Sequence, residues 1–86
     1  MKRYDPRALW KNAVLQTGRL SPVTKLVMLV LHDQMDVDGG VQYPARCVAA
    51  DLGYRNPRRI TDRIGEARKA GYLALVESAT HGRVAI

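Results

Sequence analysis

Basic side chains are concentrated in one short stretch of this chain, residues 55–69 (RNPRRITDRIGEARK). The stretch holds five arginines and one lysine against one aspartate and one glutamate, which is a net +4 of the chain's formal +6. An arginine guanidinium offers a planar set of donors that can bind a phosphate, or O6 and N7 of guanine, through two hydrogen bonds. This concentration of charge favours a polyanion as partner, and nucleic acid in particular.

The same stretch has the start and stop signals of a helix over residues 57–70. Asn56 can cap its N-terminus, Pro57 occupies the first helical position, and Gly71 can adopt the left-handed conformation that ends it. An apolar stripe at i, i+4, i+7 is formed by Ile60, Ile64 and Ala67. We therefore expect one buried face and an opposite face rich in arginine.

Two helices are predicted before this region, over residues 6–17 and 22–35. Asp5-Pro6 and Ser21-Pro22 each supply a cap followed by proline. We expect Leu9, Trp10, Ala13 and Val14 to share a broad face of the first helix, and Gly18 to end it. The second contains LVMLVL at 26–31, apolar nearly all round, so most of its sides must be covered. The cover is either the helix at 5–17 or a second subunit, and a homodimer through either helix is a possible assembly.

A turn, a short strand and a further helix lie between these elements and the basic stretch. DVDGG at 36–40 is read as a turn, since the later oxygen ligands of a calcium loop are absent. A strand is predicted at 41–43, a helix at 44–52 and a sharp turn at Gly53. Two apolar-rich segments after Gly71, separated by residues 79–82, predict a β-hairpin, so the fold class is mainly α (α+β) in a single domain, 1–86.

Several classes of function find no support in this sequence. With one cysteine and two histidines, no metal site, disulfide framework or nucleophilic triad can be assembled, and no glycine-rich phosphate loop is present. We expect a non-enzyme without cofactors, with Cys47 a small buried residue and Tyr43 and Tyr54 partly buried with their polar tips outward. The apolar runs are too short to span a bilayer, and the chain fits a reducing cytoplasm.

The order of these elements and their residues resembles the winged helix-turn-helix family, in particular small domains of bacterial, phage and plasmid replication initiators and regulators. The resemblance covers residues 20–86, with the helix at 5–17 outside it. It rests on the following segments: KLVMLVL at 25–31, DVDGG at 36–40, YPARCVAADLG at 43–53, NPRRITDRI at 56–64 and AGYL at 70–73. The sequence departs from the family pattern where Asn-Pro opens the last helix and where Ala67 stands in place of a larger residue.

The resemblance implies that helix 57–70 enters the major groove of double-stranded DNA and that a wing at 79–83 contacts the backbone or the minor groove. Predicted base contacts are Arg58, Arg59, Thr61 and Asp62. Asp62 either accepts from a cytosine amino group or pairs with Arg58 or Arg59 and orients it. Predicted phosphate contacts are Arg46, Arg55, Arg63, Lys69, Thr80, His81 and Arg83.

The implied role is sequence-specific DNA binding, as a transcriptional regulator or as an accessory protein in replication or excision, in a bacterial or host cytoplasm. The alternative is a winged helix that serves as a protein-interaction module, with its basic face against an acidic partner. The charge distribution argues against the alternative, because the core of a protein interface usually contains few charges.

Overall fold

Helices dominate the structure, with three short strands after and between them. The computed structural model describes residues 5–37, 39–77 and 83–85. Within these residues the elements are α1 (Pro6–Gln16), α2 (Pro22–Asp33), β1 (Gly40–Val41), α3 (Ala45–Leu52), α4 (Arg58–Lys69), β2 (Ala74–Glu77) and β3 (Arg83–Ala85). The mainly α class predicted from the sequence is confirmed.

A polar residue and a proline precede or open three of the helices, as predicted. α1 and α2 begin at the proline after Asp5 and Ser21, whereas α4 begins at Arg58, one residue after Asn56-Pro57. The side chains of Asp5, Ser21 and Asn56 each accept a hydrogen bond from a backbone N–H two or three residues further on, at 3.0, 3.2 and 2.9 Å respectively. Each bond satisfies one of the N–H groups that a first helical turn leaves without a partner, and proline has no N–H to satisfy. α3 begins differently, after Pro44, without a side-chain cap.

α3 and α4 end in the same way, at the two glycines for which a turn was predicted. Gly53 has φ 80° and Gly71 has φ 87°, a region that is costly for residues with a Cβ. In both helices the residue after the glycine is a tyrosine whose N–H bonds back to an alanine carbonyl, Tyr54 to Ala49 at 2.8 Å and Tyr72 to Ala67 at 2.9 Å. This pattern, the Schellman motif, satisfies the last carbonyls of each helix and turns the chain sharply.

The predicted bounds of the helices and of the first strand differ from the observed ones by one or two residues. α1 ends at Gln16 with Thr17 in an extended conformation, so Gly18 does not end it through a positive φ. α2 ends at Asp33, because the next N–H groups bond to carbonyls three residues back, Gln34 to Leu31 and Met35 to His32. β1 covers only Gly40–Val41, since the chain leaves the sheet before residue 43.

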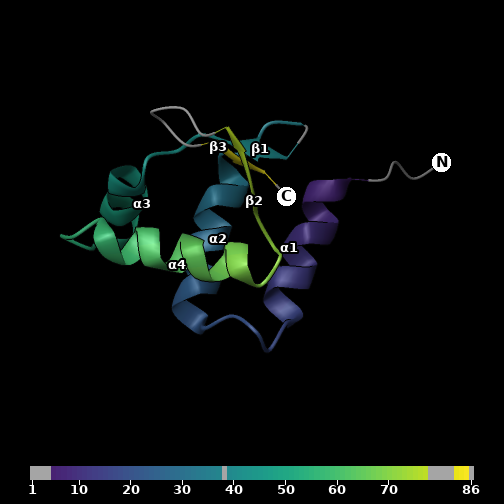
Figure 1. Ribbon diagram of the computed structural model, residues 1–86, viewed down its shortest axis with the longest axis horizontal. Helices are drawn as coiled ribbons and strands as arrows, with labels where there is room; N and C mark the ends of the chain where they lie inside the picture. Colours follow the sequence, from purple (N-terminus) through teal and green to yellow (C-terminus); the bar gives the residue numbers. More distant parts are fainter. Residues whose placement is uncertain (1–4, 38, 78–82, 86) are drawn as a thin grey trace.

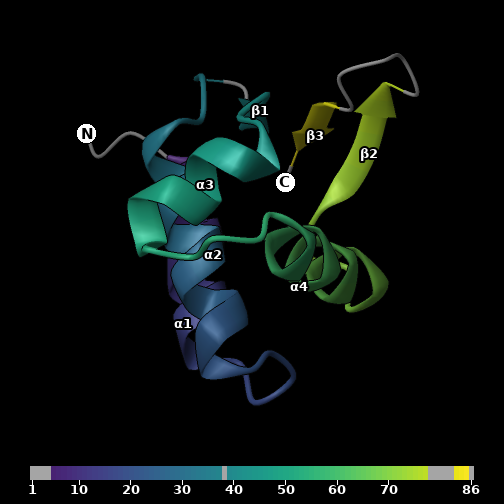
Figure 2. The ribbon, with the colours of Figure 1, turned by 90° about the vertical axis from the view of Figure 1, so that its left-hand side faces the viewer.

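α2 is the central element, and the other three helices pack around it. Figure 1 shows α1 antiparallel to α2, and α4 lying across α2. In the turned view of Figure 2, α3 lies on the side of α2 away from α1, and α4 lies beside α2. α1 therefore covers one side of the apolar run of α2, and α3 and α4 cover another.

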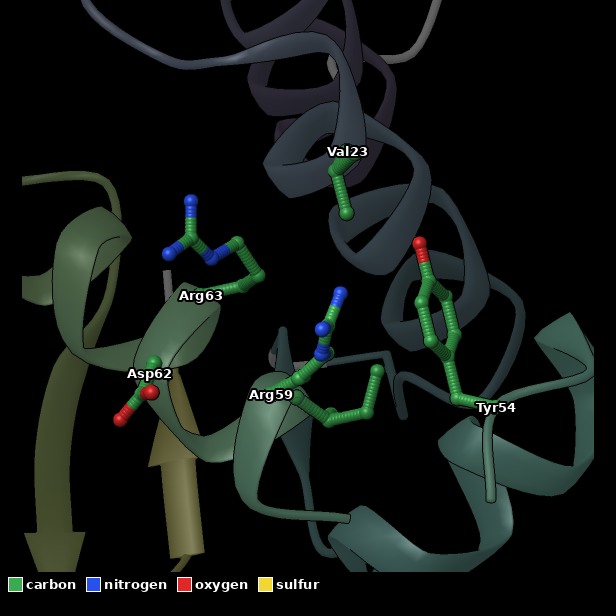
Figure 3. A pocket seen from close by; sticks show the side chains of 6 residues that line it. Val23, Tyr54, Arg59, Asp62 and Arg63 are labelled. Atoms are coloured by element: carbon green, nitrogen blue, oxygen red, sulfur yellow. The ribbon is translucent and has the colours of Figure 1, made fainter. Parts of the chain in front are cut away.

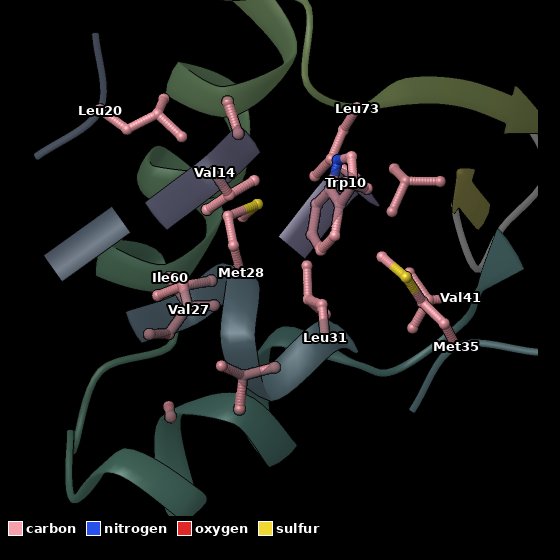
Figure 4. Packing of buried hydrophobic residues seen from close by; sticks show 14 residues of the cluster. Trp10, Val14, Leu20, Val27, Met28, Leu31, Met35, Val41, Ile60 and Leu73 are labelled. Atoms are coloured by element: carbon pink, nitrogen blue, oxygen red, sulfur yellow. The ribbon is translucent and has the colours of Figure 1, made fainter. Parts of the chain in front are cut away.

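The core is built from side chains of all four helices and of β1 and β3 (Figure 4). Val27, Met28 and Leu31 of α2 are almost completely buried at its centre. Trp10 of α1 closes one end: its indole N–H donates to the Tyr72 carbonyl at 2.6 Å, and its ring stacks on His32 at a centroid distance of 6.4 Å. A buried tryptophan needs such a partner for its N–H, and here the bond also fixes α1 to the chain after α4.

Some apolar residues are less covered than the sequence indicated. Leu26 of α2 is 50% exposed, so the apolar run is covered on the α1, α3 and α4 sides and leaves one strip in solvent. Leu9 is 48% exposed and Ala13 is exposed, which narrows the packed face of α1 to Trp10 and Val14. Cys47 is only partly buried. Periodicity shows which residues can face a core, and the positions of the neighbouring helices decide which ones do.

The strands form an antiparallel sheet of order β1-β3-β2. Val84 of β3 lies opposite Val41 on one side and Leu75 on the other, with an irregularity between Leu75 and Glu77. The segment between β2 and β3, which includes the predicted wing tip with Thr80 and His81, lies outside the described residues. A complete hairpin wing is therefore not shown by the described residues.

Candidate functional site

The turn at residues 53–57 sets α3 and α4 against each other and holds α4 across α2. Ile60 and Ala67 are fully buried on the inner face of α4 and Ile64 is partly buried, which confirms the predicted apolar stripe. Because this stripe fixes the rotation of α4 about its own axis, it also decides which side chains point outward.

The predicted base-contact residues are all exposed on α4, but they lie on two different sides of it. Arg58, Thr61 and Asp62 are on the outward side, together with Lys69. The Thr61 hydroxyl donates to the Pro57 carbonyl of the preceding turn at 3.3 Å, which leaves its oxygen free to accept. Arg59 lies instead on the flank of α4 that faces α2, where it lines a pocket.

Cations without a carboxylate partner gather on α3, on the turn and on α4. Among the described residues of these elements, six exposed basic side chains form no ion pair: Arg46, Arg55, Arg58, Arg59, Arg68 and Lys69. Unpaired guanidinium groups keep all their donors available for an external anion.

Asp62 does not orient either neighbouring arginine. The expected ion pair from Asp62 to Arg58 or Arg59 is not formed in the part of the chain that the structure describes, although both lie within helical pairing distance in sequence. Figure 3 shows the reason for Arg59: its side chain extends toward α2, while the Asp62 carboxylate points away from it. The orienting role is therefore wrong in this conformation, and the role of accepting from a base is untested.

Arg63, predicted as a phosphate contact, is engaged within the molecule. Its Nη1 donates to the Glu66 carboxylate at 3.1 Å. The other oxygen of Glu66 accepts from the backbone N–H of Ser21 at 3.1 Å, immediately before α2 begins. The hydrogen bond from Ser21, with smaller contributions from the Thr24 hydroxyl and the charge of Arg63, lowers the pKa of Glu66 below its ordinary value of 4.5.

Glu66 is a functional candidate that sequence reasoning missed. Its carboxylate joins α4 to the start of α2, so it helps to fix the angle at which α4 is presented. The Arg63–Glu66 spacing of i, i+3 was visible in the sequence, whereas the contact with Ser21, 45 residues away, was not.

A pocket of about 340 Å³ opens between the first half of α4, the start of α2 and Tyr54 in the turn after α3. Val23, Tyr54 and Ile60 supply apolar surface, and Arg59, Asp62 and Arg63 are the charged residues at its edge. In Figure 3 the guanidinium groups of Arg59 and Arg63 and the Tyr54 hydroxyl all extend toward α2. Tyr54 is partly buried, as predicted, and its hydroxyl points toward α2.

The remaining residues predicted to contact phosphates lie on α3, in the turn and at the start of β3, or outside the residues that the structure describes. Arg46 is on α3, Arg55 is in the turn, and Arg83 begins β3, where only its backbone is described. Thr80 and His81 are outside the described residues. Tyr43, also partly buried, donates its hydroxyl to the Asp51 carboxylate at 2.7 Å, and this bond raises the pKa of the tyrosine.

Comparison of the chain with protein-family models, with curated proteins and with solved structures gave no match. Within the described residues, no group of three or more metal-binding side chains comes together, and none of the helices has the length and hydropathy needed to cross a bilayer. Function must therefore be inferred from the geometry and charge of α3, α4 and the turn between them.

Proposed function

We propose that this chain is a winged helix-turn-helix domain that binds double-stranded DNA in a sequence-dependent manner, with α4 in the major groove. The process it serves is transcriptional regulation, or an accessory role in replication or excision. On this proposal Arg58, Thr61 and Asp62 contact base edges, and Arg46, Arg55 and Lys69 contact phosphates.

The observation that carries the proposal is the set of six exposed, unpaired cations on α3, the turn and α4. A solvated surface usually intersperses charges of both signs, whereas on these elements the described residues show one ion pair, Arg63–Glu66, beside six cations without one. α4 is also a helix of 12 residues held by its apolar stripe, which leaves its outer face uncovered. A helix presented in this way, after a short helix and a tight turn, has the form that enters a major groove.

Selection of bound duplexes from a random library tests this proposal directly. We expect enrichment of a short motif, and a binding constant that falls with salt because phosphate contacts release counterions. With three to five such contacts, log K against log salt should have a slope between about −3 and −4.5. If the library yields no motif and the protein fails to shift a duplex at low salt, the DNA-binding proposal is wrong.

Single substitutions separate base from phosphate contacts. Arg58→Ala should weaken the selected site by about 1–3 kcal/mol while sparing unrelated duplexes. Lys69→Ala should weaken all duplexes alike and reduce the salt slope by about 1. Lys11→Ala, which removes one charge from α1, is the matched control and should leave both specificity and slope nearly unchanged. Light scattering of the complex with the selected duplex would then show whether one or two copies bind.

A further inference from the structure

We propose that the pocket between α4 and α2 is a binding site for a small amphipathic anion, a compact apolar body that carries one phosphate or carboxylate group. The inference rests on the pocket's lining and needs no contact with DNA. Its volume of about 340 Å³ lies at the lower end of the range for small-molecule sites.

The charged part of the lining selects for an anion. Arg59 is exposed and has no ion-pair partner among the described residues, and its guanidinium extends toward α2. Arg63 gives Nη1 to Glu66 and retains further N–H donors. The Tyr54 hydroxyl extends in the same direction, and Asp62, the one carboxylate of the lining, points away. The pocket thus offers the unpaired cation of Arg59, the Tyr54 hydroxyl and the remaining N–H donors of Arg63, whose own charge is balanced by Glu66.

The apolar part of the lining selects for more than a bare oxyanion. Val23 projects from the first turn of α2 toward Arg59, and the Tyr54 ring forms a side wall. Ile60 is the third apolar residue of the lining. A phosphodiester of a DNA backbone is hydrated and gains nothing from such a wall, whereas an apolar body that covers it gains free energy in proportion to the area buried. Charge and apolar surface in one pocket therefore favour a ligand that has both.

Occupancy would act on DNA binding if the proposed function holds. A bound anion would neutralise Arg59 on the first half of α4, next to Arg58, and would add negative potential beside the surface proposed to meet DNA. The ligand and a duplex should then each weaken the binding of the other by the same factor.

Titration of the uniformly ¹⁵N-labelled protein, followed by amide NMR shifts without DNA, tests the site itself. Phenyl phosphate and benzoate are the complete probes, because each carries an apolar ring and an anionic group. The half-probes are inorganic phosphate, which has the charge without the ring, and benzyl alcohol, which has the ring without the charge. We expect saturable shifts centred on residues 23, 54, 59, 60 and 63 with one or both complete probes, at concentrations where neither half-probe shifts them. Equal shifts with inorganic phosphate would show a simple oxyanion subsite and would overturn the proposal, as would the absence of saturable shifts with both complete probes.

Variants then assign the contacts. Arg59→Ala should raise the dissociation constant of the better probe about tenfold, and Tyr54→Phe, which keeps the ring, about three- to tenfold. Arg68→Ala removes an exposed arginine of α4 that does not line the pocket, and it should leave the constant unchanged. If Arg59→Ala and Arg68→Ala have the same effect, binding is a response to net charge and the proposed site is wrong. Because these measurements contain no duplex, their outcome is independent of whether DNA binding is found.

Discussion

Glu66 offers the sharpest test of how α4 is held, because its carboxylate bonds both to the start of α2 and to Arg63 of α4 itself. It accepts from the Ser21 backbone N–H at 3.1 Å and from Arg63 at 3.1 Å. Glu66→Gln keeps the size and one acceptor oxygen of the side chain but removes the charge. The substitution therefore asks how much of the docking depends on a carboxylate.

The expected loss follows from the two contacts taken separately. The Arg63–Glu66 pair lies on the helix surface, with side chains 36% and 29% exposed, and such an i, i+3 pair contributes about 0.2–0.5 kcal/mol. The bond from Ser21 is charge-assisted and partly buried. A glutamine oxygen would keep about half of its strength, a loss of about 1 kcal/mol. The sum, about 1–1.5 kcal/mol, corresponds to a fall in Tm of about 5–10 °C for a domain of this size.

The pH dependence distinguishes this mechanism from a simple packing defect. The pKa of Glu66 is lower in the folded protein than its ordinary 4.5, chiefly because its charged form accepts from Ser21. Its contribution to stability is therefore fully present above pH 4.5 and is lost as the pH falls through the folded-state pKa. Urea unfolding followed by circular dichroism should show the full difference between wild type and Glu66→Gln at pH 7, and a smaller difference as the pH falls below 4.5.

Asp62→Asn supplies the matched control, since Asp62 is an exposed carboxylate of the same helix without an ion pair among the described residues. It should change the free energy of unfolding by less than about 0.5 kcal/mol at either pH. A loss for Glu66→Gln that is equal at pH 7 and pH 3, or that is no larger than the loss for Asp62→Asn, would refute the assigned role of the carboxylate.

Other substitutions test the packing and the helix ends by thermal or urea unfolding. Trp10→Phe leaves the Tyr72 carbonyl without its 2.6 Å donor and should lower the free energy of unfolding by about 1–3 kcal/mol. A loss below about 0.5 kcal/mol would mean that water replaces the indole N–H as donor. Met28→Ala, at a fully buried position, should cost about 2–5 kcal/mol, and a near-neutral result would mean that the core there collapses freely. Gly65→Ala should stabilise the protein by about 0.5–1 kcal/mol, since an added Cβ at this helical position meets nothing within 4 Å. Gly71→Ala should destabilise it, because Gly71 has a φ of 87°. Effects of the same sign would contradict the assignment of Gly71 as the end of α4.

Most of the helical framework was predictable because its signals are local. Asp5, Ser21 and Asn56 act within three residues of themselves, and Gly53 and Gly71 end helices through their own backbone conformation. The apolar stripe of α4 was predictable for the same reason, because a period of 3.6 residues defines a face whatever that face meets. The boundaries of α1 and α2 were less certain, since Thr17 and Gln34 carry no comparably strong signal.

What could not be predicted depends on the relative positions of distant elements. The hydrogen bond of the Trp10 indole needs the Tyr72 carbonyl, 62 residues away. The exposure of Leu26 depends on which part of α2 is left uncovered by α3 and α4. The same holds for the candidate site. A helical wheel was enough to predict which residues lie on the outward side of α4. The pocket lined by Val23 and Tyr54 exists only because α2, α4 and the turn after α3 meet there.

In the structure, the cations of α4 face different directions and different partners, which a count of charges along the sequence does not show. Arg63 is tied to Glu66, Arg59 turns toward α2, and Arg58 and Lys69 remain on the outward side. A net charge counted along residues 55–69 therefore overstates what one surface can offer to one partner. A salt slope much steeper than about −4.5 would require phosphate contacts from beyond this helix and its turn. A slope near −3 would mean that the outward side and Arg55 carry the electrostatic attraction, with Arg59 left for the pocket beside α2.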